Sequence, residues 1–367
     1  MSHRIEITTR DGQAFEFACE PGQDVLAAAA AAQITLPSQC RRGSCGACYA
    51  SVAEGEYTLG AHSADALLPG DPHAVLLCCT TPQSDLRIAA PYDGTKVLLQ
   101  PVAVRRARIA ALETIADDTR RVELQLEPDD AYGSAAEFEA GQFVELELPE
   151  SGVRRPFSLA NTSNWDGRLE LLIRLRADGV FSSYLREHAK VGDALIVHGP
   201  QGGFGLFAES LRPRWFVAGG TGLAPVLSML RRMAEYQEMN DARLFFGVNR
   251  ASELFMVDEL DRLQSELAQL RVELCVREGE GGDEDEGSDG QDARRGFRGT
   301  PVEALKVALA SADTSANTSP NTAANTSPNA SPDLYVCGPP GMVSAAQAVA
   351  MAAGVPAAQF ASERFAV

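Results

Sequence analysis

Four cysteine residues near the N-terminus have a spacing that points to metal chemistry. Cys40, Cys45 and Cys48 follow the pattern C-x4-C-x2-C, and Cys78 follows 30 residues later. Plant-type [2Fe–2S] sites show this spacing, because three thiolates from one loop and a fourth from elsewhere must converge on two irons. Glycines within the loop let backbone N–H groups point at the sulfurs. The pattern therefore predicts that these four residues bind a [2Fe–2S] cluster.

Two alternatives concern the same cysteines. A structural zinc site normally presents C-x2-C pairs, and the first gap here is four residues, which disfavours zinc. Cys79 competes with Cys78 for the fourth ligand position, and we predict Cys78 as the ligand. Cys19 and Cys275 are expected in hydrophobic cores. The N-terminal segment shows no apolar signal core, so we expect a cytoplasmic protein in which disulfides are disfavoured.

Two motifs in the middle of the chain suggest a second cofactor. Residues 155–158 (Arg-Pro-Phe-Ser) come just after a predicted strand, and residues 179–182 (Gly-Val-Phe-Ser) open a predicted helix. An arginine can bind a diphosphate, an aromatic ring can stack on a flat ring, and free amides at a helix start bind anions. Each motif alone also fits a strand end or a simple turn, but together, beside an iron–sulfur loop, they suggest a flavin. The candidates are Arg155, Phe157, Ser158, Gly179, Val180, Phe181 and Ser182.

Two glycine-rich turns in the last third of the chain suggest a nucleotide site. Residues 219–225 follow a predicted strand and open a helix, and residues 337–342 end the last predicted strand. Such turns place a diphosphate on helix amides, and ligands of open α/β sheets bind at the carboxyl edge. Either turn alone also fits a tight strand-to-helix connection. The candidates are Gly220, Thr221, Gly222, Pro225, Gly338 and Pro339.

The hydrophobic patterns divide the chain into three domains of different construction. Residues 1–96 contain the four predicted cluster cysteines. Residues 102–207 carry many short strands and one helix, which predicts an antiparallel β-barrel. In residues 212–367 strands and helices alternate, which predicts an α/β domain with a parallel sheet. Residues 279–293, an acidic run, and residues 313–332, a repetitive segment rich in Asn, Thr, Ser and Pro, are expected as solvated insertions.

Some local expectations in the first domain are specific enough to test. Residues 4–8 and 13–18 alternate apolar and polar side chains around Asp11-Gly12, which predicts a hairpin. An alanine-rich helix follows. Residues 52–59 and 75–79 are predicted as strands, and residues 91–100 as a linker.

Charge limits the possible partners. The chain has 367 residues, of which 50 are acidic and 32 basic, with a net charge of −18. Such a surface repels the phosphates of nucleic acids and anionic lipids, so we expect neither nucleic acid nor membrane as a partner. The alanine-rich stretch is far shorter than the roughly 20 residues that span a bilayer.

With these motifs in place, the whole chain resembles the reductase component of soluble methane monooxygenase and its relatives that serve other bacterial diiron hydroxylases. The N-terminal third is similar to a plant-type ferredoxin, an α+β domain of β-grasp type, and the rest is similar to the ferredoxin–NADP⁺ reductase superfamily. The resemblance is end to end except for the two insertions. The matching stretches are 40–48, 54–59, 76–80, 179–185, 199–205, 216–229, 246–249 and 334–342.

The resemblance implies FAD and NADH as cofactors in addition to the cluster. Arg155 would contact the FAD diphosphate, Phe157 would pack on the isoalloxazine, and Ser158 would hydrogen-bond near N5. The family often has tyrosine where this chain has Phe157. Residues 179–182 would bind the flavin phosphate, and residues 220–222 the NADH diphosphate.

The same resemblance implies residues around the reacting atoms. Cys337 would lie against the nicotinamide, and Glu363 and Phe365 would border both rings, so that these three residues and Ser158 form the predicted catalytic set. The family prefers NADH. Arg250 follows the stretch 246–249 and could reach a 2′-phosphate, which leaves NADPH as an alternative.

The implied reaction is hydride transfer from NADH to FAD, followed by single-electron transfer through the [2Fe–2S] cluster to a diiron hydroxylase. Methane or another short-chain hydrocarbon would be oxidised on that separate protein, and this chain is expected to be a monomer. One alternative is a reductase for a Rieske-type aromatic-ring dioxygenase, built from the same modules. Another is an electron-carrier ferredoxin with a vestigial reductase.

Overall fold

The computed structural model describes residues 2–67, 71–207, 210–277, 296–315 and 331–365. The predicted insertion 279–293 lies outside these residues, as does most of the insertion 313–332. The insertion predicted over residues 313–332 is wrong at its start, because the preceding helix continues to Ser315.

The N-terminal domain is a five-stranded mixed sheet with one helix packed on it. Its strand order is β2-β1-β7-β3-β5, with β1 and β7 parallel. The helix begins after Asp24, whose carboxylate accepts a hydrogen bond from the N–H of Ala27 at 2.8 Å. The predicted hairpin and helix are confirmed. The elements are β1 His3–Thr8, β2 Ala14–Cys19, α1 Val25–Ala31, β3 Tyr49–Glu54, β5 Ala74–Leu76 and β7 Leu86–Ala89.

Two strands predicted in this domain are shorter than expected. The strand predicted over 52–59 is interrupted at Gly55, where φ is +105° and an added Cβ would lie 2.1 Å from the carbonyl of Asp85. After the interruption β4 (Tyr57–Leu59) pairs with β6 (Thr80–Pro82) in a separate sheet. The strand predicted over 75–79 ends at Leu76, because residues Leu77–Cys79 form a 3₁₀ turn.

The segment 91–100, predicted as a linker, belongs in part to the first domain. Tyr92 and Val97 are buried in its hydrophobic core. Thr35 and Leu98 exchange backbone hydrogen bonds at 2.8 and 3.0 Å. The domain boundaries at 96, 102, 207 and 212 stay predictions.

The middle domain is a six-stranded antiparallel barrel with one helix. The strand order is β11-β10-β13-β8-β9-β12, and a bridge between Leu159 and Leu171 brings the two edges together. The prediction that residues 155–158 come just after a strand is wrong, because these residues belong to β11 itself. Pro156 has no N–H to donate, and such a residue is tolerated in an edge strand. The elements are β8 Val104–Ala116, β9 Thr119–Leu126, β10 Phe143–Glu147, β11 Arg154–Ser158, β12 Arg168–Arg174, α2 Val180–Glu187 and β13 Ala194–Gln201.

The C-terminal domain is a parallel sheet with helices on both faces. Its strand order is β17-β16-β15-β14-β18-β19, so the order reverses between β14 and β18. Helices α3 and α4 contribute to the core on one face, and α5 and α6 to the core on the other. The sequence patterns missed the two edge strands, β17 and β19. The elements are β14 Arg214–Gly219, α3 Leu223–Glu235, β15 Ala242–Val248, α4 Val257–Glu266, β16 Leu270–Val276, β17 Gly296–Arg298, α5 Pro301–Ser315, β18 Asp333–Gly338, α6 Pro340–Ala352 and β19 Phe360–Arg364.

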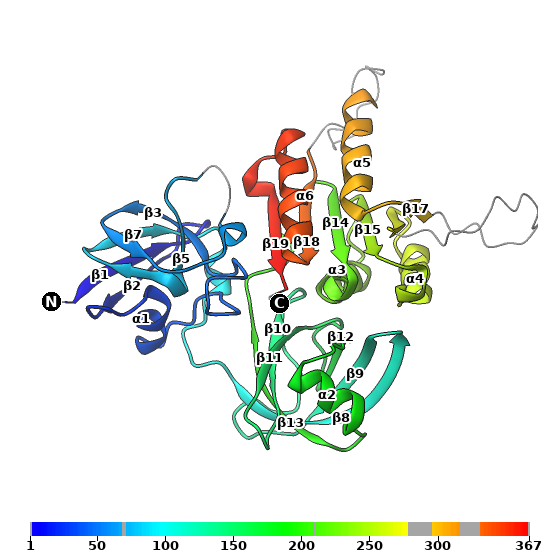
Figure 1. Ribbon diagram of the computed structural model, residues 1–367, viewed down its shortest axis with the longest axis horizontal. Coiled ribbons are helices and arrows are strands. Elements are labelled where there is room, and N and C mark those ends of the chain that lie inside the picture. Colours follow the sequence, from blue (N-terminus) through cyan, green and yellow to red (C-terminus); the bar gives the residue numbers. More distant parts are fainter. Residues whose placement is uncertain (1, 68–70, 208–209, 278–295, 316–330, 366–367) are drawn as a thin grey trace, which may run out of the picture.

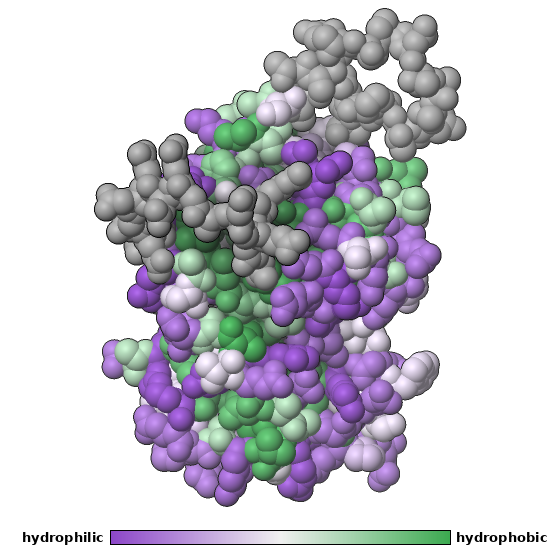
Figure 2. Space-filling view, turned by 90° about the vertical axis from the view of Figure 1, so that its right-hand side faces the viewer, coloured by the Kyte–Doolittle hydropathy of each residue, from purple (hydrophilic) through white to green (hydrophobic). Residues whose placement is uncertain are grey.

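The three domains meet around the end of β19 (Figure 1). The N-terminal domain lies beside α6 and β19, and the barrel lies below the carboxyl edge of the parallel sheet. The side facing away from the N-terminal domain is mainly hydrophilic, with small hydrophobic patches among the polar residues (Figure 2). None of the helices described is long and apolar enough to cross a membrane.

Candidate functional site

The four predicted cluster ligands lie together as two pairs of sulfurs. Cys48 and Cys78 are 3.4 Å apart at Sγ, and the Cys40 side chain hydrogen-bonds with that of Cys45. A centre with two irons requires two thiolates on each iron, whereas a zinc ion requires all its ligands around one point. The arrangement of the four sulfurs in two pairs fits two irons.

The loop around these sulfurs already supplies hydrogen-bond donors. The N–H groups of Arg42 and Ser44 each donate to Cys40 Sγ at 3.4 Å, and that of Ala47 donates to Cys45 Sγ at 3.5 Å. The side-chain hydrogen bond with Cys45 and the N–H groups of Arg42 and Ser44 lower the pKa of Cys40 to about 4, whereas the bond with Cys40 raises the pKa of Cys45. A metal ligand must be deprotonated, so within this pair the loop favours Cys40 as the thiolate.

The choice between Cys78 and Cys79 follows from their partners. The Cys48 thiol lowers the pKa of Cys78 to about 6, although burial opposes this. Burial raises the pKa of Cys79 to about 12, and its thiol donates to the carbonyl of Ala61 at 3.5 Å. Cys78 is thus the more easily deprotonated of the two thiols, and its Sγ is the one that pairs with Cys48, which supports Cys78 as the fourth ligand.

A second group of predicted residues meets where the barrel touches the parallel sheet. Ser158 Oγ on β11 donates to Glu363 Oε2 on β19 at 3.0 Å, and Cys337 Sγ on β18 lies 3.8 Å from the same oxygen. Ser158 and Glu363 are buried, and Cys337 is fully buried. Burial raises the pKa of Glu363 to about 7, and the hydrogen bonds from Ser158 and Cys337 only partly oppose it. Phe365, the fourth residue of this set, donates its N–H to the carbonyl of Gly338 at 3.1 Å.

The two glycine turns lie side by side at the carboxyl edge of the sheet, at the point where the strand order reverses. Residues Gly220, Thr221 and Pro339 are accessible there and could contact a nucleotide. Gly222 has a different role, since an added Cβ would lie 2.1 Å from the carbonyl of Cys337. Gly222 therefore allows the turns to approach each other. Pro225 and Gly338 are also buried, which places them behind the accessible surface.

The barrel residues predicted to bind a flavin also divide into accessible and buried ones. Phe157 is half-buried, and its ring lies 5.1 Å from that of Phe181, which belongs to the barrel core. Gly179 caps α2, so the amides of its first turn are available to an anion. Val180 is exposed, and Ser182 Oγ accepts a hydrogen bond from the N–H of Arg176 at 3.0 Å.

Arg155 is well placed to bind a phosphate. Its side chain is exposed and hydrogen-bonds to the carbonyl of Arg154 at 2.7 Å, and among the described residues it forms no ion pair. Arg155→Ala should weaken FAD binding about 10- to 100-fold, because charge-assisted hydrogen bonds contribute about 1.5–3 kcal/mol. Fluorescence titration of the cofactor-free protein with FAD measures the change.

Arg154 offers a matched control, because neighbouring residues of a strand point to opposite faces. Its guanidinium pairs with Glu147 at 2.5 Å. Arg154→Ala should leave FAD affinity within about twofold of the parent value. An equal loss of affinity in both variants would remove Arg155 from the flavin site.

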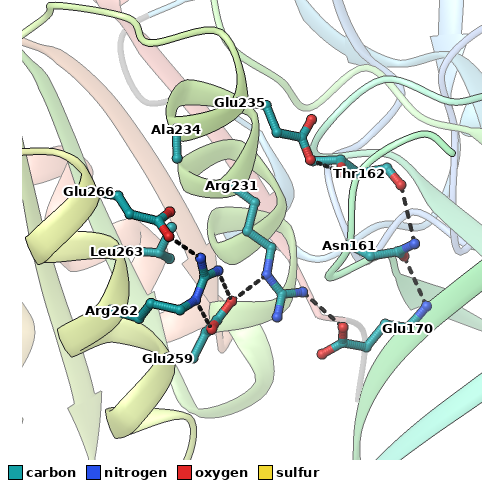
Figure 3. Close-up of a pocket in the computed structure, with 10 residues that line it drawn as sticks. All are labelled: Asn161, Thr162, Glu170, Arg231, Ala234, Glu235, Glu259, Arg262, Leu263 and Glu266. Carbon is teal, nitrogen blue, oxygen red and sulfur yellow. Dashed lines mark hydrogen bonds and ion pairs between the residues drawn. The ribbon is translucent and has the colours of Figure 1, made fainter.

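A cavity of ≈ 410 Å³ lies on another side of the interface between the barrel and the parallel sheet (Figure 3). Arg231 on α3 crosses this interface, donating to Glu170 on β12 at 2.8 Å and to Glu259 on α4 at 2.7 Å. Burial alone would raise the pKa of Glu259, but hydrogen bonds from Arg262 and Arg231 outweigh it and lower the pKa to about 2. Arg231 and Arg262 pair with Glu170, Glu259 and Glu266, so this cavity lies at a junction between the two domains.

Arg231→Met should loosen this junction. The substitution leaves the buried carboxylate of Glu170 with one partner fewer, which should lower the free energy of unfolding by about 2 kcal/mol. The temperature at which FAD is released should therefore fall by about 4–8 °C. The FAD fluorescence released on heating measures this temperature. Arg262→Met is the control, because Arg262 is half-exposed and, among the described residues, pairs only with Glu259 and Glu266 of α4. It should change the temperature by less than about 3 °C. Equal shifts in the two variants would contradict a junction role for Arg231.

Comparison with known proteins agrees with this geometry. A family described as a 2Fe-2S iron-sulfur cluster binding domain matches residues 8–83. An oxidoreductase FAD-binding domain matches residues 106–205, and an oxidoreductase NAD-binding domain matches residues 216–348. Fold, site and families together define an iron–sulfur flavoprotein oxidoreductase with FAD, NAD and a [2Fe–2S] cluster. The reductase half is therefore not vestigial.

Similarity to individual proteins identifies the family. The chain is 36% identical to methane monooxygenase component C of Methylosinus trichosporium, over 84% of this chain and 87% of that one. It is 30% identical to the toluate 1,2-dioxygenase electron transfer component of Pseudomonas putida, over 100% and 99% of the two chains. The structure resembles the cytochrome P450 reductase GcoB of Amycolatopsis, with a TM-score of 0.68, 27% identity and 98% of each chain covered. The chain belongs to the family of ferredoxin-fused reductases that serve bacterial oxygenases.

Proposed function

We propose that this chain oxidises NADH and delivers single electrons to the diiron hydroxylase of a multicomponent monooxygenase. The hydrogen bond from Ser158 to Glu363 carries the proposal, because it joins the barrel to the parallel sheet where the flavin and nicotinamide sites meet. The similarity to a methane monooxygenase component supports the class of partner.

The cofactors supply the conversion of a hydride, which carries two electrons, into the single electrons that a [2Fe–2S] cluster accepts. The protein residues place and enclose the reacting groups. Ser158 and Glu363 fix the approach of the two domains, and the buried Cys337 keeps water from this point. The amides around Cys40 and Cys45 compensate the negative charge of the cluster thiolates.

NADH is favoured over NADPH by the neighbours of Arg250. Its guanidinium pairs with Glu253 at 3.0 Å, and Glu253 also accepts the N–H of Asn249 at 3.2 Å. The cation that could bind a 2′-phosphate is therefore already neutralised. A carboxylate near the end of the second strand suits the free 2′-hydroxyl of NADH.

We propose methane or another short-chain hydrocarbon as the compound oxidised on the partner. A Rieske-type dioxygenase is the second candidate, since the toluate 1,2-dioxygenase component is similar along the whole chain. The higher identity to the methane monooxygenase component favours the first candidate. We also propose a monomer in the cytoplasm, where reducing conditions suit the eight cysteines, all free of disulfides.

The test is reconstitution. The purified protein, loaded with FAD and iron, is mixed anaerobically with NADH and either a diiron hydroxylase or a Rieske oxygenase. We expect fast reduction of the diiron centre and slow reduction of the Rieske centre. Preference for the Rieske centre would select the second candidate, and failure of NADH to bleach the flavin would contradict the proposal.

A further inference from the structure

Strand β19 presents two consecutive charged residues to two different sites. Side chains alternate between the faces of a strand, so Glu363 and Arg364 point in opposite directions. Glu363 contacts Ser158 and Cys337. Arg364 instead reaches the cysteine loop of the N-terminal domain, where an added Cβ on Gly46 would lie 2.7 Å from its Nη1. One strand end thus separates the flavin–nicotinamide site from the cluster loop.

The guanidinium of Arg364 is buried without a matching anion. Only 4% of the residue is exposed, and Nε is buried with no hydrogen-bond partner. Within the described part of the chain Arg364 forms no ion pair of 4 Å or less; the groups whose charge acts on it are Asp65 and Cys45. A buried charge without a partner is costly. The thiolates of a [2Fe–2S] cluster would supply the missing negative charge, which grows by one when the cluster is reduced.

Other contacts hold the N-terminal domain in this position. Lys96 forms an ion pair with Glu139 of the segment before β10. The guanidinium of Arg10 lies 4.7 Å from the centre of the Phe207 ring. In addition to these contacts, Arg364 lies directly against the cluster loop at Gly46.

We propose that Arg364 is a positioning residue for electron transfer: it keeps the cluster loop against β19, and its positive charge stabilises the reduced cluster. The inference rests on the proposed electron path from flavin to cluster. The inference adds that the positive charge beside the cluster comes from the nucleotide-binding domain. The potential of the cluster therefore depends on how the N-terminal domain packs against β19.

The experiment uses the full chain loaded with both cofactors. Arg364→Met removes the charge at similar length, Arg364→Lys retains it, and Arg271→Met is the charge-matched control. Arg271 is exposed on β16, four strands from β19 in the sheet, or about 19 Å at the usual strand spacing. Redox titration followed by the EPR signal of the reduced cluster gives its potential. Rapid mixing with NADH gives the rates of flavin and cluster reduction separately.

We expect Arg364→Met to shift the electron equilibrium about tenfold from cluster to flavin, which for one electron is about 59 mV in the cluster potential. Cluster reduction should slow about tenfold or more, with flavin reduction by NADH unchanged. Arg364→Lys should restore most of the potential, and Arg271→Met should match the parent.

A cluster potential in Arg364→Met equal to that of Arg271→Met would overturn the proposal. If Arg364→Met does not load the cluster, Arg364→Gln takes its place. Loading by Arg364→Lys but by neither uncharged variant would support a required charge, and loss in all three would overturn the electrostatic role. Failure of the parent protein to reduce its flavin would contradict the proposed function instead, so the two failures are distinguishable.

Discussion

Replacing Cys45 with serine should abolish electron delivery through the cluster while leaving flavin reduction by NADH intact. Cys45 is 3% exposed and accepts N–H groups from Cys40 and Ala47, so no other thiol can take its place without rebuilding the loop. A serine oxygen is shorter and a poorer ligand for these irons than a thiolate. The residues proposed for the flavin site lie on β11, α2 and β19, outside this loop.

Two electron acceptors separate the effects in this variant. Ferricyanide can take electrons from a reduced flavin, and cytochrome c reports the path through the cluster. Cys45→Ser should retain the first activity within about twofold and lose the second by at least about 100-fold, with loss of the visible absorption of the cluster. Loss of both activities would contradict separate roles for the two centres.

Cys79→Ser is the matched control for this experiment. Its thiol donates to Ala61 and lies 3.6 Å from Cys78 Sγ, so the substitution tests the neighbouring position with the same chemical change. The variant should keep cluster absorption and cytochrome c reduction. A colourless Cys79→Ser protein together with a coloured Cys78→Ser protein would reverse the choice of the fourth ligand.

The cysteine site could be predicted from sequence because most of its geometry is local. Three of the four ligands lie within nine residues, and their spacing already determines how the loop must turn. The two glycine turns were predictable for a related reason: strands of one parallel sheet end at one edge, so two turns far apart in sequence must meet there. Glu363 was named through the resemblance alone, because no local pattern predicted β19.

Arg364 and Arg231 could not be predicted from sequence. Their significance depends on which domain lies opposite, and neither arginine carries a motif. The contact between Arg364 and Gly46 joins positions more than 300 residues apart. Arg231 looks like a surface charge on an amphipathic helix until Glu170 of the barrel is placed beside it. Domain docking buries Arg364 and leaves Arg231 half-buried between two carboxylates.

Local strand patterns failed where backbone shape outweighs side-chain type. Apolar alternation continues through Gly55, but the close carbonyl of Asp85 and the positive φ end the strand there. The arginine and proline residues of β11 are untypical of a strand, so the sequence pattern did not indicate this edge strand. It carries three of the predicted flavin residues, Arg155, Phe157 and Ser158. The motif that suggested chemistry was therefore also the reason that the strand was missed.

Glu363→Gln should make the protein more stable above pH 7 and less active. The pKa of Glu363 in the folded protein, about 7, lies above its ordinary value of 4.5. The folded state therefore binds this proton more tightly than the unfolded state, and stability falls as the pH rises from about 4.5 to about 7. The difference of about 2.5 pKa units corresponds to about 3 kcal/mol. Glutamine is neutral at every pH and should remove this loss.

The stability arm compares urea unfolding of the two cofactor-free proteins between pH 5 and pH 8. The curves should nearly coincide at pH 5, where Glu363 is protonated, and separate by up to about 3 kcal/mol at pH 8. Ser158 and Cys337 face the carboxyl group from β11 and β18, and among the described residues no cation does. A constant difference across this pH range would show that Glu363 does not titrate there.

The activity of Glu363→Gln should change in the opposite direction to its stability. If the nicotinamide ring binds beside Glu363, as the resemblance implies, the ionised carboxylate would stabilise the positive charge that the ring gains when it gives up a hydride. Flavin reduction by NADH in the parent protein should therefore increase as the pH rises through about 7, and Glu363→Gln should lose this increase and be about 100-fold slower at pH 8. Active-site residues often lower the stability of the folded protein while they increase its activity, and a buried carboxylate would do both. A fast, pH-independent Glu363→Gln protein would show that Glu363 only joins the domains.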